Sequence, residues 1–479
     1  TESTENANLE RQNLRYVKAG GDFIWWSERS GWGHYYLYDH DGKYKNAITA
    51  GDWRAEAIAE VDSVGRVLWF RAVGREDGEV PYYTHLYRVN LDGSGLALLD
   101  AGDATHNSTL SPSRRFIVDT YSRIDLPPKA VLRDAAGREL LKLEETDVSR
   151  LTEYGWKPPE RFVVKAADGV TNIFGNIFKP FDFDPSRKYP IIANVYPGPQ
   201  TEQVTYNFAP TAIQQRLAQL GFIVIQIGNR GGSPQRSNAY QHHGYFNLRD
   251  YGLADKKAGI EQLATRFPWI DIDRVGIFGH SGGGFMTAAA LLQPPYNDFF
   301  KVGVSSAGNH DNNVYNQNWS EQYHGLKEIR VPRNANLIAA NGRGGRNRAR
   351  GAAQKNQAAG QQDGQSDAQL KASADTANGT EYVTKFDIHI PANHEIASNL
   401  KGRLLLVHGD MDNNVHPAGT IRLANALIKA NKRFDLMLMP GKPHGYGDMQ
   451  PYYTRLMMEY FAEHLLGDYY RTNAEMRGK

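Results

Sequence analysis

Short runs of aromatic and β-branched residues alternate with polar turns over the first 155 residues of the chain. Pairs of such runs, each followed by a turn that contains glycine, recur about every 44 to 48 residues. The runs are Phe23–Trp26 with Tyr35–Tyr38, Val67–Phe70 with His85–Val89, and Phe116–Val118 with Ala130–Arg133, and the turns are Asp41–Gly42, Asp92–Gly93 and Ala136–Gly137. Runs of this length with such turns are typical of antiparallel hairpins. The pattern predicts an all-β region over residues 1–155.

The length of this repeat is that of a β-propeller blade. About three blades fit into residues 1–155, whereas a closed propeller needs roughly four to eight. We therefore expect a partial β-propeller, and we expect the chain to be the C-terminal portion of a longer protein.

Residues 156–470 have a different pattern, in which fully apolar runs alternate with helix-like stretches. The runs that resemble buried strands are Ile191–Val195, Arg274–Phe278, Arg403–Val407 and Phe434–Met439. Buried strands that alternate with helices are typical of an α/β sheet. We therefore predict two domains, an all-β domain over 1–155 and an α/β domain over 156–470.

Residues 331–385 interrupt the α/β domain with a low-complexity insertion. Its central part, 341–380, is rich in Gly, Ala, Gln, Asn and Asp and has no sustained apolar period. Such a segment cannot bury enough surface to offset its ordering entropy, so we expect a loosely held surface insertion. A lid over a nearby site is the alternative. Its arginines at 343, 346, 348 and 350 lack the interleaved aromatic residues of single-strand binders, which argues against nucleic acid as a partner.

Composition narrows the chemistry further. The 479 residues carry a formal net charge of +2, which implies no general attraction to nucleic acid or to a membrane surface. The chain has no cysteine, which excludes disulfides, cysteine-ligated zinc and a thiol nucleophile. No apolar run is long enough for a membrane span, and Thr1–Arg11 is too polar for a signal peptide. The pairs His242–His243 and His408 with His416 lack carboxylates at ligand spacing, so we expect neither a metal nor another cofactor.

Gly279–Gly283 is the most informative motif. It reads Gly-His-Ser-Gly-Gly and lies between the strand-like run Arg274–Phe278 and the helix-like run Phe285–Leu292. A sharp turn from strand to helix at a serine, with glycines two residues before and after it, is typical of a nucleophile elbow. The motif predicts Ser281 as the nucleophile and the Gly282 N–H as an oxyanion donor at the helix N-terminus.

An acid and a histidine follow Ser281 in the order of an α/β-hydrolase triad, each in a loop after a strand. His444 follows the strand that ends near Met439. Asp410 and Asp412 both follow the strand Arg403–Val407, and strand geometry alone does not separate them. In this chemistry the imidazole accepts the serine proton and the carboxylate fixes the imidazole tautomer.

From about Glu160 to Leu466 the chain resembles the catalytic domain of the prolyl oligopeptidase family of serine peptidases, and most of all its dipeptidyl peptidase IV branch. The motifs that carry the resemblance are Asn194–Pro199, Asn229–Gly232, Pro268–Asp271 and His408–His416. The resemblance implies that Asp412 is the triad acid and that the hydroxyl of Tyr196 is the second oxyanion donor. Tyr196 also follows the strand Ile191–Val195, at the edge where open α/β sheets bind ligands.

The resemblance implies a substrate pocket as well. Tyr315 and Trp319 match aromatic positions of the proline pocket, Val415 matches an apolar wall, and Asn414 matches an amide that holds a substrate carbonyl. Tyr315 and Trp319 would share one face if their segment is helical.

Three departures from the family pattern widen this pocket and make it more polar. The residue after the nucleophile is Gly282 instead of tyrosine, and Asn309 and Asn312 replace apolar or aromatic residues. We therefore expect a shallow preference for the residue before the cleaved bond. The paired glutamates that hold a substrate's amino terminus in dipeptidyl peptidases have no visible counterpart in this sequence.

The sequence thus predicts an α/β-hydrolase domain preceded by an all-β partial β-propeller, with the activity of a serine peptidase. By resemblance it releases X-Pro or X-Ala dipeptides from peptide N-termini, is located in the periplasm or secreted, and is compatible with a homodimer. The alternatives are an oligopeptidase, acylaminoacyl peptidase or esterase of the same fold, and a non-catalytic binding module built on the propeller.

Overall fold

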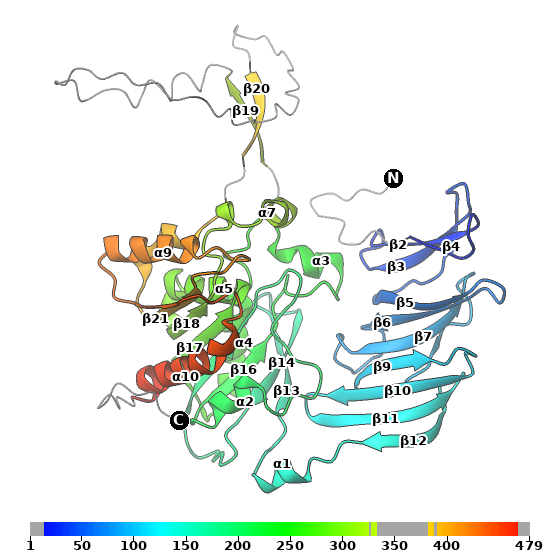
Figure 1. Ribbon diagram of the computed structural model, residues 1–479, viewed down its shortest axis with the longest axis horizontal. Coiled ribbons are helices and arrows are strands. Elements are labelled where there is room, and N and C mark those ends of the chain that lie inside the picture. Colours follow the sequence, from blue (N-terminus) through cyan, green and yellow to red (C-terminus); the bar gives the residue numbers. More distant parts are fainter. Residues whose placement is uncertain (1–13, 325–326, 333–381, 388–389, 468–479) are drawn as a thin grey trace. The chain divides into compact units, whose positions relative to one another are not determined.

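The computed structural model describes residues 14–324, 327–332, 382–387 and 390–467 (Figure 1). The chain divides into two compact units, one formed by residues 1–323 with 390–479 and the other by residues 324–389. Each unit is described by itself.

The first part of the larger unit consists of three antiparallel sheets of four strands each, coloured blue to cyan in Figure 1. Their strands are β1 (Leu14–Tyr16), β2 (Phe23–Ser27), β3 (His34–Tyr38) and β4 (Tyr44–Ala47); β5 (Arg54–Asp62), β6 (Val67–Val73), β7 (Thr84–Asn90) and β8 (Ala97–Leu98); and β9 (Thr105–Leu110), β10 (Phe116–Arg123), β11 (Leu126–Asp134) and β12 (Glu139–Glu145). In each sheet the strands pair in chain order. This all-β region confirms the first half of the predicted fold class.

The glycine turns join different strands from those that the sequence pattern paired. Asp41–Gly42 lies between β3 and β4, and Ala136–Gly137 lies between β11 and β12. Gly42 has φ 82° and Gly137 has φ 83°, a left-handed conformation that side chains other than glycine rarely adopt. Each turn therefore leads to an outer strand that the hydrophobic pattern did not reveal.

The second part of the larger unit is built on one eight-stranded sheet, in the order β13-β14-β16-β15-β17-β18-β21-β22. The strands are β13 (Glu160–Lys165), β14 (Asn172–Phe178), β15 (Tyr189–Asn194), β16 (Ile223–Ile227), β17 (Ile270–His280), β18 (Phe300–Ser306), β21 (Arg403–Gly409) and β22 (Asp435–Met439). From β16 to β22 all neighbouring strands are parallel. This sheet confirms the α/β-hydrolase half of the predicted fold class.

Two hydrophobic clusters hold helices against this sheet. One cluster joins apolar residues of the sheet to α4 (Leu253–Arg266), α5 (Gly282–Leu292) and α9 (Ala418–Lys429). The other joins the sheet to α2 (Ile213–Ala218) and α10 (Gln450–Phe461). No helix among the described residues is both long and apolar enough to cross a bilayer.

Shorter helical elements complete this unit. They are α1 (Ser149–Glu153), α3 (Asn238–Gln241), α6 (Tyr296–Phe299) and α7 (Gln317–His324), the 3₁₀ turns His242–Gly244, Asn312–Val314, Asn393–Asn399 and Gly447–Met449, and the π-helical turn Ala462–Leu466.

We propose residue 155, between α1 and β13, as the boundary between the all-β and α/β domains.

The smaller unit contains β19 (Lys327–Pro332) and β20 (Tyr382–Asp387), which pair antiparallel. The sequence did not predict this pair. Most of the expected insertion over 331–385 lies outside the described residues, since 333–381 are not described.

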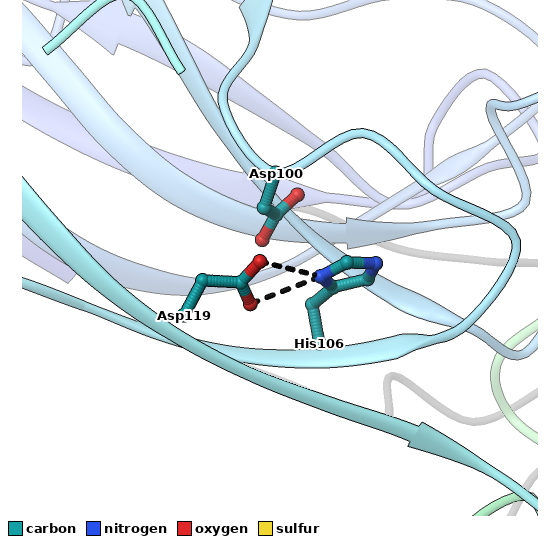
Figure 2. A group of neighbouring side chains, drawn as sticks. All are labelled: Asp100, His106 and Asp119. Carbon is teal, nitrogen blue, oxygen red and sulfur yellow. Dashed lines mark hydrogen bonds and ion pairs between the residues drawn. The ribbon is translucent and has the colours of Figure 1, made fainter. Parts of the chain in front are cut away.

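A buried polar network lies in the all-β region around Asp119 on β10 (Figure 2). His106 Nδ1 lies 3.0 Å from both carboxylate oxygens of Asp119, and its Nε2 lies 3.1 Å from the Gly102 carbonyl. Arg133 Nε donates to Asp119 at 2.9 Å, and Ser108 Oγ lies within 3.0 Å of Asp119. Burial alone would raise the pKa of Asp119, but the hydrogen bonds from His106 and Arg133 outweigh it and lower that pKa.

Asp100, His106 and Asp119 offer ligand atoms within 4.8 Å of one another. These atoms already have protein partners: Asp100 accepts from the Leu86 N–H at 2.8 Å and from Ser108 Oγ at 2.7 Å, and Asp119 is paired with a cation. A metal would have to displace these bonds. The arrangement therefore holds neighbouring strands together and carries no metal assignment.

We predict that Asp119→Asn destabilises the protein by about 3–5 kcal/mol, because it leaves the buried Arg133 without a counter-charge. Chemical denaturation monitored by circular dichroism measures the loss. Asp77→Asn, at an exposed position, should change the unfolding free energy by no more than about 0.5 kcal/mol. A loss at Asp119 as small as that at Asp77 would contradict this account.

Candidate active site

Ser281 lies in a sharp turn between β17, which ends at His280, and α5, which begins at Gly282. Its backbone has φ 58° and ψ −122°, a conformation that costs a residue other than glycine on the order of 1–3 kcal/mol. The turn is held by a hydrogen bond from the Ser281 N–H to the Ser306 carbonyl at 2.8 Å. The strained geometry is that of the predicted nucleophile elbow.

The flanking glycines are required by close contacts with neighbouring backbone. A Cβ at Gly279 would lie 2.5 Å from the Val195 carbonyl oxygen, and one at Gly283 would lie 2.2 Å from the same atom. Both distances are too short for any side chain, so only glycine lets β15, β17 and α5 approach this closely.

Tyr196 follows β15 and lies against the first residue of α5. A Cβ at Gly282 would be 3.0 Å from Tyr196 Cζ and 3.2 Å from its hydroxyl oxygen. The phenol hydroxyl and the Gly282 N–H are therefore neighbours beside Ser281. When Ser281 Oγ adds to a carbonyl carbon, the resulting oxyanion on the carbonyl oxygen can accept hydrogen bonds from both donors.

Asp412 and His444 are brought together by the loops after β21 and β22. His444 Nδ1 lies 2.6 Å from Asp412 Oδ2, and the Asp412 side chain is fully buried. The other carboxylate oxygen, Oδ1, accepts hydrogen bonds from the N–H groups of Asn414 and Val415, each at 2.9 Å. Burial alone would raise the pKa of Asp412, but the bonds from His444 and Val415 outweigh it and lower that pKa.

Asp410, the rival acid, is exposed and accepts a hydrogen bond from the Gly441 N–H at 2.6 Å. It makes no hydrogen bond to His444 in the described part of the chain, so the geometry favours Asp412. Ser281 Oγ and His444 are likewise not joined by a hydrogen bond among the described atoms. In proteins without substrate such catalytic bonds are often long and tighten only in the complex.

His280 supports His444 from one side, a contact that the sequence did not suggest. The two imidazole rings are 4.5 Å apart, and His280 Nδ1 lies 2.8 Å from Ser306 Oγ, which in turn lies 2.7 Å from the Tyr446 hydroxyl. Burial and, to a smaller extent, the neighbouring His444 lower the pKa of His280 to about 4. His280 is therefore neutral near pH 7 and packs against the ring of His444.

His408 contributes a similar support behind the acid. It is buried, with Nε2 2.9 Å from the Val415 carbonyl and 3.2 Å from Asp412 Oδ2. In the sequence it was marked by its position at the end of a predicted strand and by the motif His408–His416. That position does not reveal the direction of the side chain.

A small pocket opens beside Ser281. Its lining is formed by Tyr196, Pro197, Gly198, Leu248, Tyr251, Ser281, Gly282, Phe285, Asn309, Asn312, Tyr315 and Trp319. Tyr315 precedes α7 and Trp319 lies on it, so they share no helix face, but their rings meet edge to face at 5.5 Å. The structure therefore brings both predicted aromatic residues to the pocket.

Asn414 and Val415 are absent from the described lining of this pocket. Asn414 Oδ1 accepts a hydrogen bond from the Tyr315 hydroxyl at 3.4 Å, which places it next to a lining residue. Val415 is buried, and its backbone holds Asp412 and His408. A contact of either side chain with substrate stays a prediction.

Two family models match the chain. Residues 208–337 and 365–468 match the prolyl oligopeptidase family, and residues 2–128 match the dipeptidyl peptidase IV (DPP IV) N-terminal region. These matches cover the α/β sheet after β15 and most of the all-β region.

Similar curated proteins are dipeptidyl peptidases. Dipeptidyl peptidase 8 from Homo sapiens is 28% identical over 440 residues, which cover 88% of this chain and 42% of the relative. Dipeptidyl peptidase 4 from Trichophyton rubrum is 25% identical over 425 residues, which cover 85% of this chain and 46% of the relative. The chain thus spans less than half the length of these relatives.

The fold is similar to that of a solved structure, dipeptidyl peptidase 4 from Porphyromonas gingivalis. The TM-score is 0.73 at 24% sequence identity, and the match covers 94% of this chain and 56% of that chain. At this identity the likeness supports the fold alone.

We predict that Asp412→Asn lowers kcat by roughly 10⁴, because an amide stabilises the wrong tautomer of His444. Asp410→Asn is the matched control and should lower kcat far less. Steady-state kinetics on a chromogenic peptide amide measures both. If the two effects were reversed, the acid would be Asp410.

We predict that Tyr196→Phe lowers kcat by roughly 10² to 10³ with little change in KM, because the lost hydroxyl bonds the oxyanion only in the transition state. Tyr154→Phe removes the hydroxyl of an exposed tyrosine and should leave both constants unchanged. A change confined to KM would make Tyr196 a packing residue instead.

Proposed function

Because this chain belongs to the prolyl oligopeptidase family, in its dipeptidyl peptidase IV branch, we propose that it is a serine peptidase that hydrolyses peptide amides through an acyl-enzyme on Ser281. For the whole protein we propose the release of dipeptides from peptide N-termini. The similar proteins are named dipeptidyl peptidases, which supports this second proposal, and this chain spans only part of their length.

The observation that carries the proposal is the pair formed by Asp412 and His444. A fully buried carboxylate 2.6 Å from an imidazole nitrogen, in a loop beside a serine elbow, is the arrangement that hydroxyl activation requires. With Nδ1 bonded to Asp412, the Nε2 nitrogen of His444 is left to exchange a proton with Ser281.

In the first half of the reaction, His444 Nε2 accepts the Ser281 hydroxyl proton while Oγ bonds to the substrate carbonyl carbon. The resulting oxyanion accepts hydrogen bonds from the Gly282 N–H and the Tyr196 hydroxyl. His444 then donates its proton to the leaving amine, the C–N bond breaks, and an ester remains on Ser281.

In the second half, water replaces the amine. His444 accepts a proton from the water as its oxygen attacks the ester carbon, and returns that proton to Ser281 Oγ as the C–O bond breaks. The released acid carries the water oxygen. Asp412 stays ionised throughout, consistent with its lowered pKa, and stabilises the imidazolium.

Selection for a free amino terminus would require a negatively charged group near the pocket. No carboxylate lines the pocket among the described residues. For this chain we therefore expect amide cleavage with weak dependence on the substrate's amino terminus. The whole protein should favour the free amine.

Comparing an X-Pro or X-Ala amide with its N-acetylated form tests the proposal. Preference of the whole protein for the free amine supports dipeptide release, whereas equal cleavage of both forms favours an oligopeptidase or acylaminoacyl peptidase. Cleavage of activated esters without any amide would make the protein an esterase. Absence of all hydrolysis would leave the non-catalytic binding module.

A homodimer and a location in the periplasm or outside the cell are further proposals that rest on the family resemblance. Sedimentation equilibrium tests the first, since a monomer at micromolar concentration would contradict it. Cell fractionation of the source organism tests the second.

A further inference from the structure

Two asparagines form one side of the pocket beside Ser281. Asn309 and Asn312 line it with exposed fractions of only 7% and 2%. Their loop is well anchored: Ser320 Oγ donates to the Asn312 carbonyl at 2.9 Å, and the intervening His310 lies 3.1 Å from the amide of Asn393. The two carboxamides are therefore held in place before any substrate enters.

The hydrogen-bonding capacity of this pair is only partly used. Asn309 Nδ2 donates to Asn312 Oδ1 at 2.6 Å, while Asn309 Oδ1 and Asn312 Nδ2 have no partner among the described residues. Exchanging nitrogen and oxygen in both side chains gives the same outcome, one unpaired acceptor and one unpaired donor. The conclusion thus does not depend on how the amides are oriented.

A buried polar atom without a partner is costly, and an apolar ligand would leave both atoms unpaired. A ligand group that reaches this pair, donating one hydrogen bond and accepting another, would satisfy both atoms. Hydroxyl and carboxamide groups do this. A charged group finds no opposite charge, because no acidic or basic residue is among the described lining residues.

The remaining lining suits the carbon part of such a side chain. Phe285, Tyr315 and Trp319 supply aromatic walls, and Ser281 with its candidate oxyanion donors is at the same pocket. A substrate side chain that enters here therefore belongs to the residue whose carbonyl Ser281 attacks, the P1 residue.

We propose that the pocket selects an uncharged polar P1 residue, with threonine and asparagine as its best forms, through hydrogen bonds to Asn309 and Asn312. The inference rests on the proposed peptidase function and narrows its substrate class. It differs from the proline or alanine preference that family resemblance alone implies.

The test uses matched substrate pairs that differ by one polar group at nearly constant shape. X-Thr and X-Val amides form one pair, and X-Asn and X-Leu amides form the other. A site built to hydrogen-bond a substrate group rejects the analogue that lacks it, so we expect kcat/KM to favour the polar member by about tenfold or more. An X-Pro amide is measured alongside and should be cleaved less well than X-Thr.

The double variant Asn309→Leu with Asn312→Leu removes both partners together, which avoids a new unpaired group. It should bring the Thr-to-Val ratio to about one or below. Asn107→Leu, at an exposed position on β9, is the matched control and should keep the wild-type ratio. If the double variant fails to fold, the wild-type ratios still decide.

The outcomes separate the two levels of the argument. Amide cleavage that favours valine over threonine, or proline over both, would overturn the P1 assignment and leave the peptidase function intact. Absence of cleavage for every amide would overturn both.

Discussion

The close approach of four backbone segments around Ser281 is the constraint on which the rest of the site depends. Glycines at 279, 283 and 284 let the turn pack against the carbonyl oxygens of Val195 and Ser306, where any Cβ would lie 2.2 to 2.5 Å from an oxygen. This packing holds Ser281 at φ 58°, at the turn from β17 into α5. Because β15 and β17 are neighbours, the same packing places Tyr196 beside the turn.

The parallel strands then bring together residues that are distant in the chain. Ser281, Asp412 and His444 follow β17, β21 and β22, which lie on one side of the sheet order and end at the same edge. Two polar side chains support them: the buried His408 lies behind Asp412, and the half-buried His280 lies against His444. The low pKa of His280 keeps it neutral near pH 7, so it places no positive charge against His444. These contacts orient Asp412 and His444 in the absence of substrate, and such preorganised groups are what electrostatic stabilisation of a transition state requires.

Local motifs allowed much of this to be predicted from the sequence. The elbow at Ser281 and the two later loops could be recognised because a strand-like run precedes each candidate residue. The family resemblance then indicated Asp412, and not Asp410, as the acid. The outer strands were missed because their side chains do not alternate in burial: all seven residues of β12 are exposed. The contacts of His280 and His408, the network around Asp119 and the pairing of β19 with β20 were missed for another reason. Each depends on where side chains point or on which segments meet in the fold, and neither composition nor periodicity encodes that.

The central claim is that Ser281 is a nucleophile activated by His444 and Asp412. Labelling the intact chain with a fluorophosphonate, followed by peptide mapping with mass spectrometry, tests it most directly. The account predicts a single phosphonyl adduct on Ser281 and no labelling of the Ser281→Ala variant. An adduct on another serine, or undiminished labelling of the variant, would contradict it.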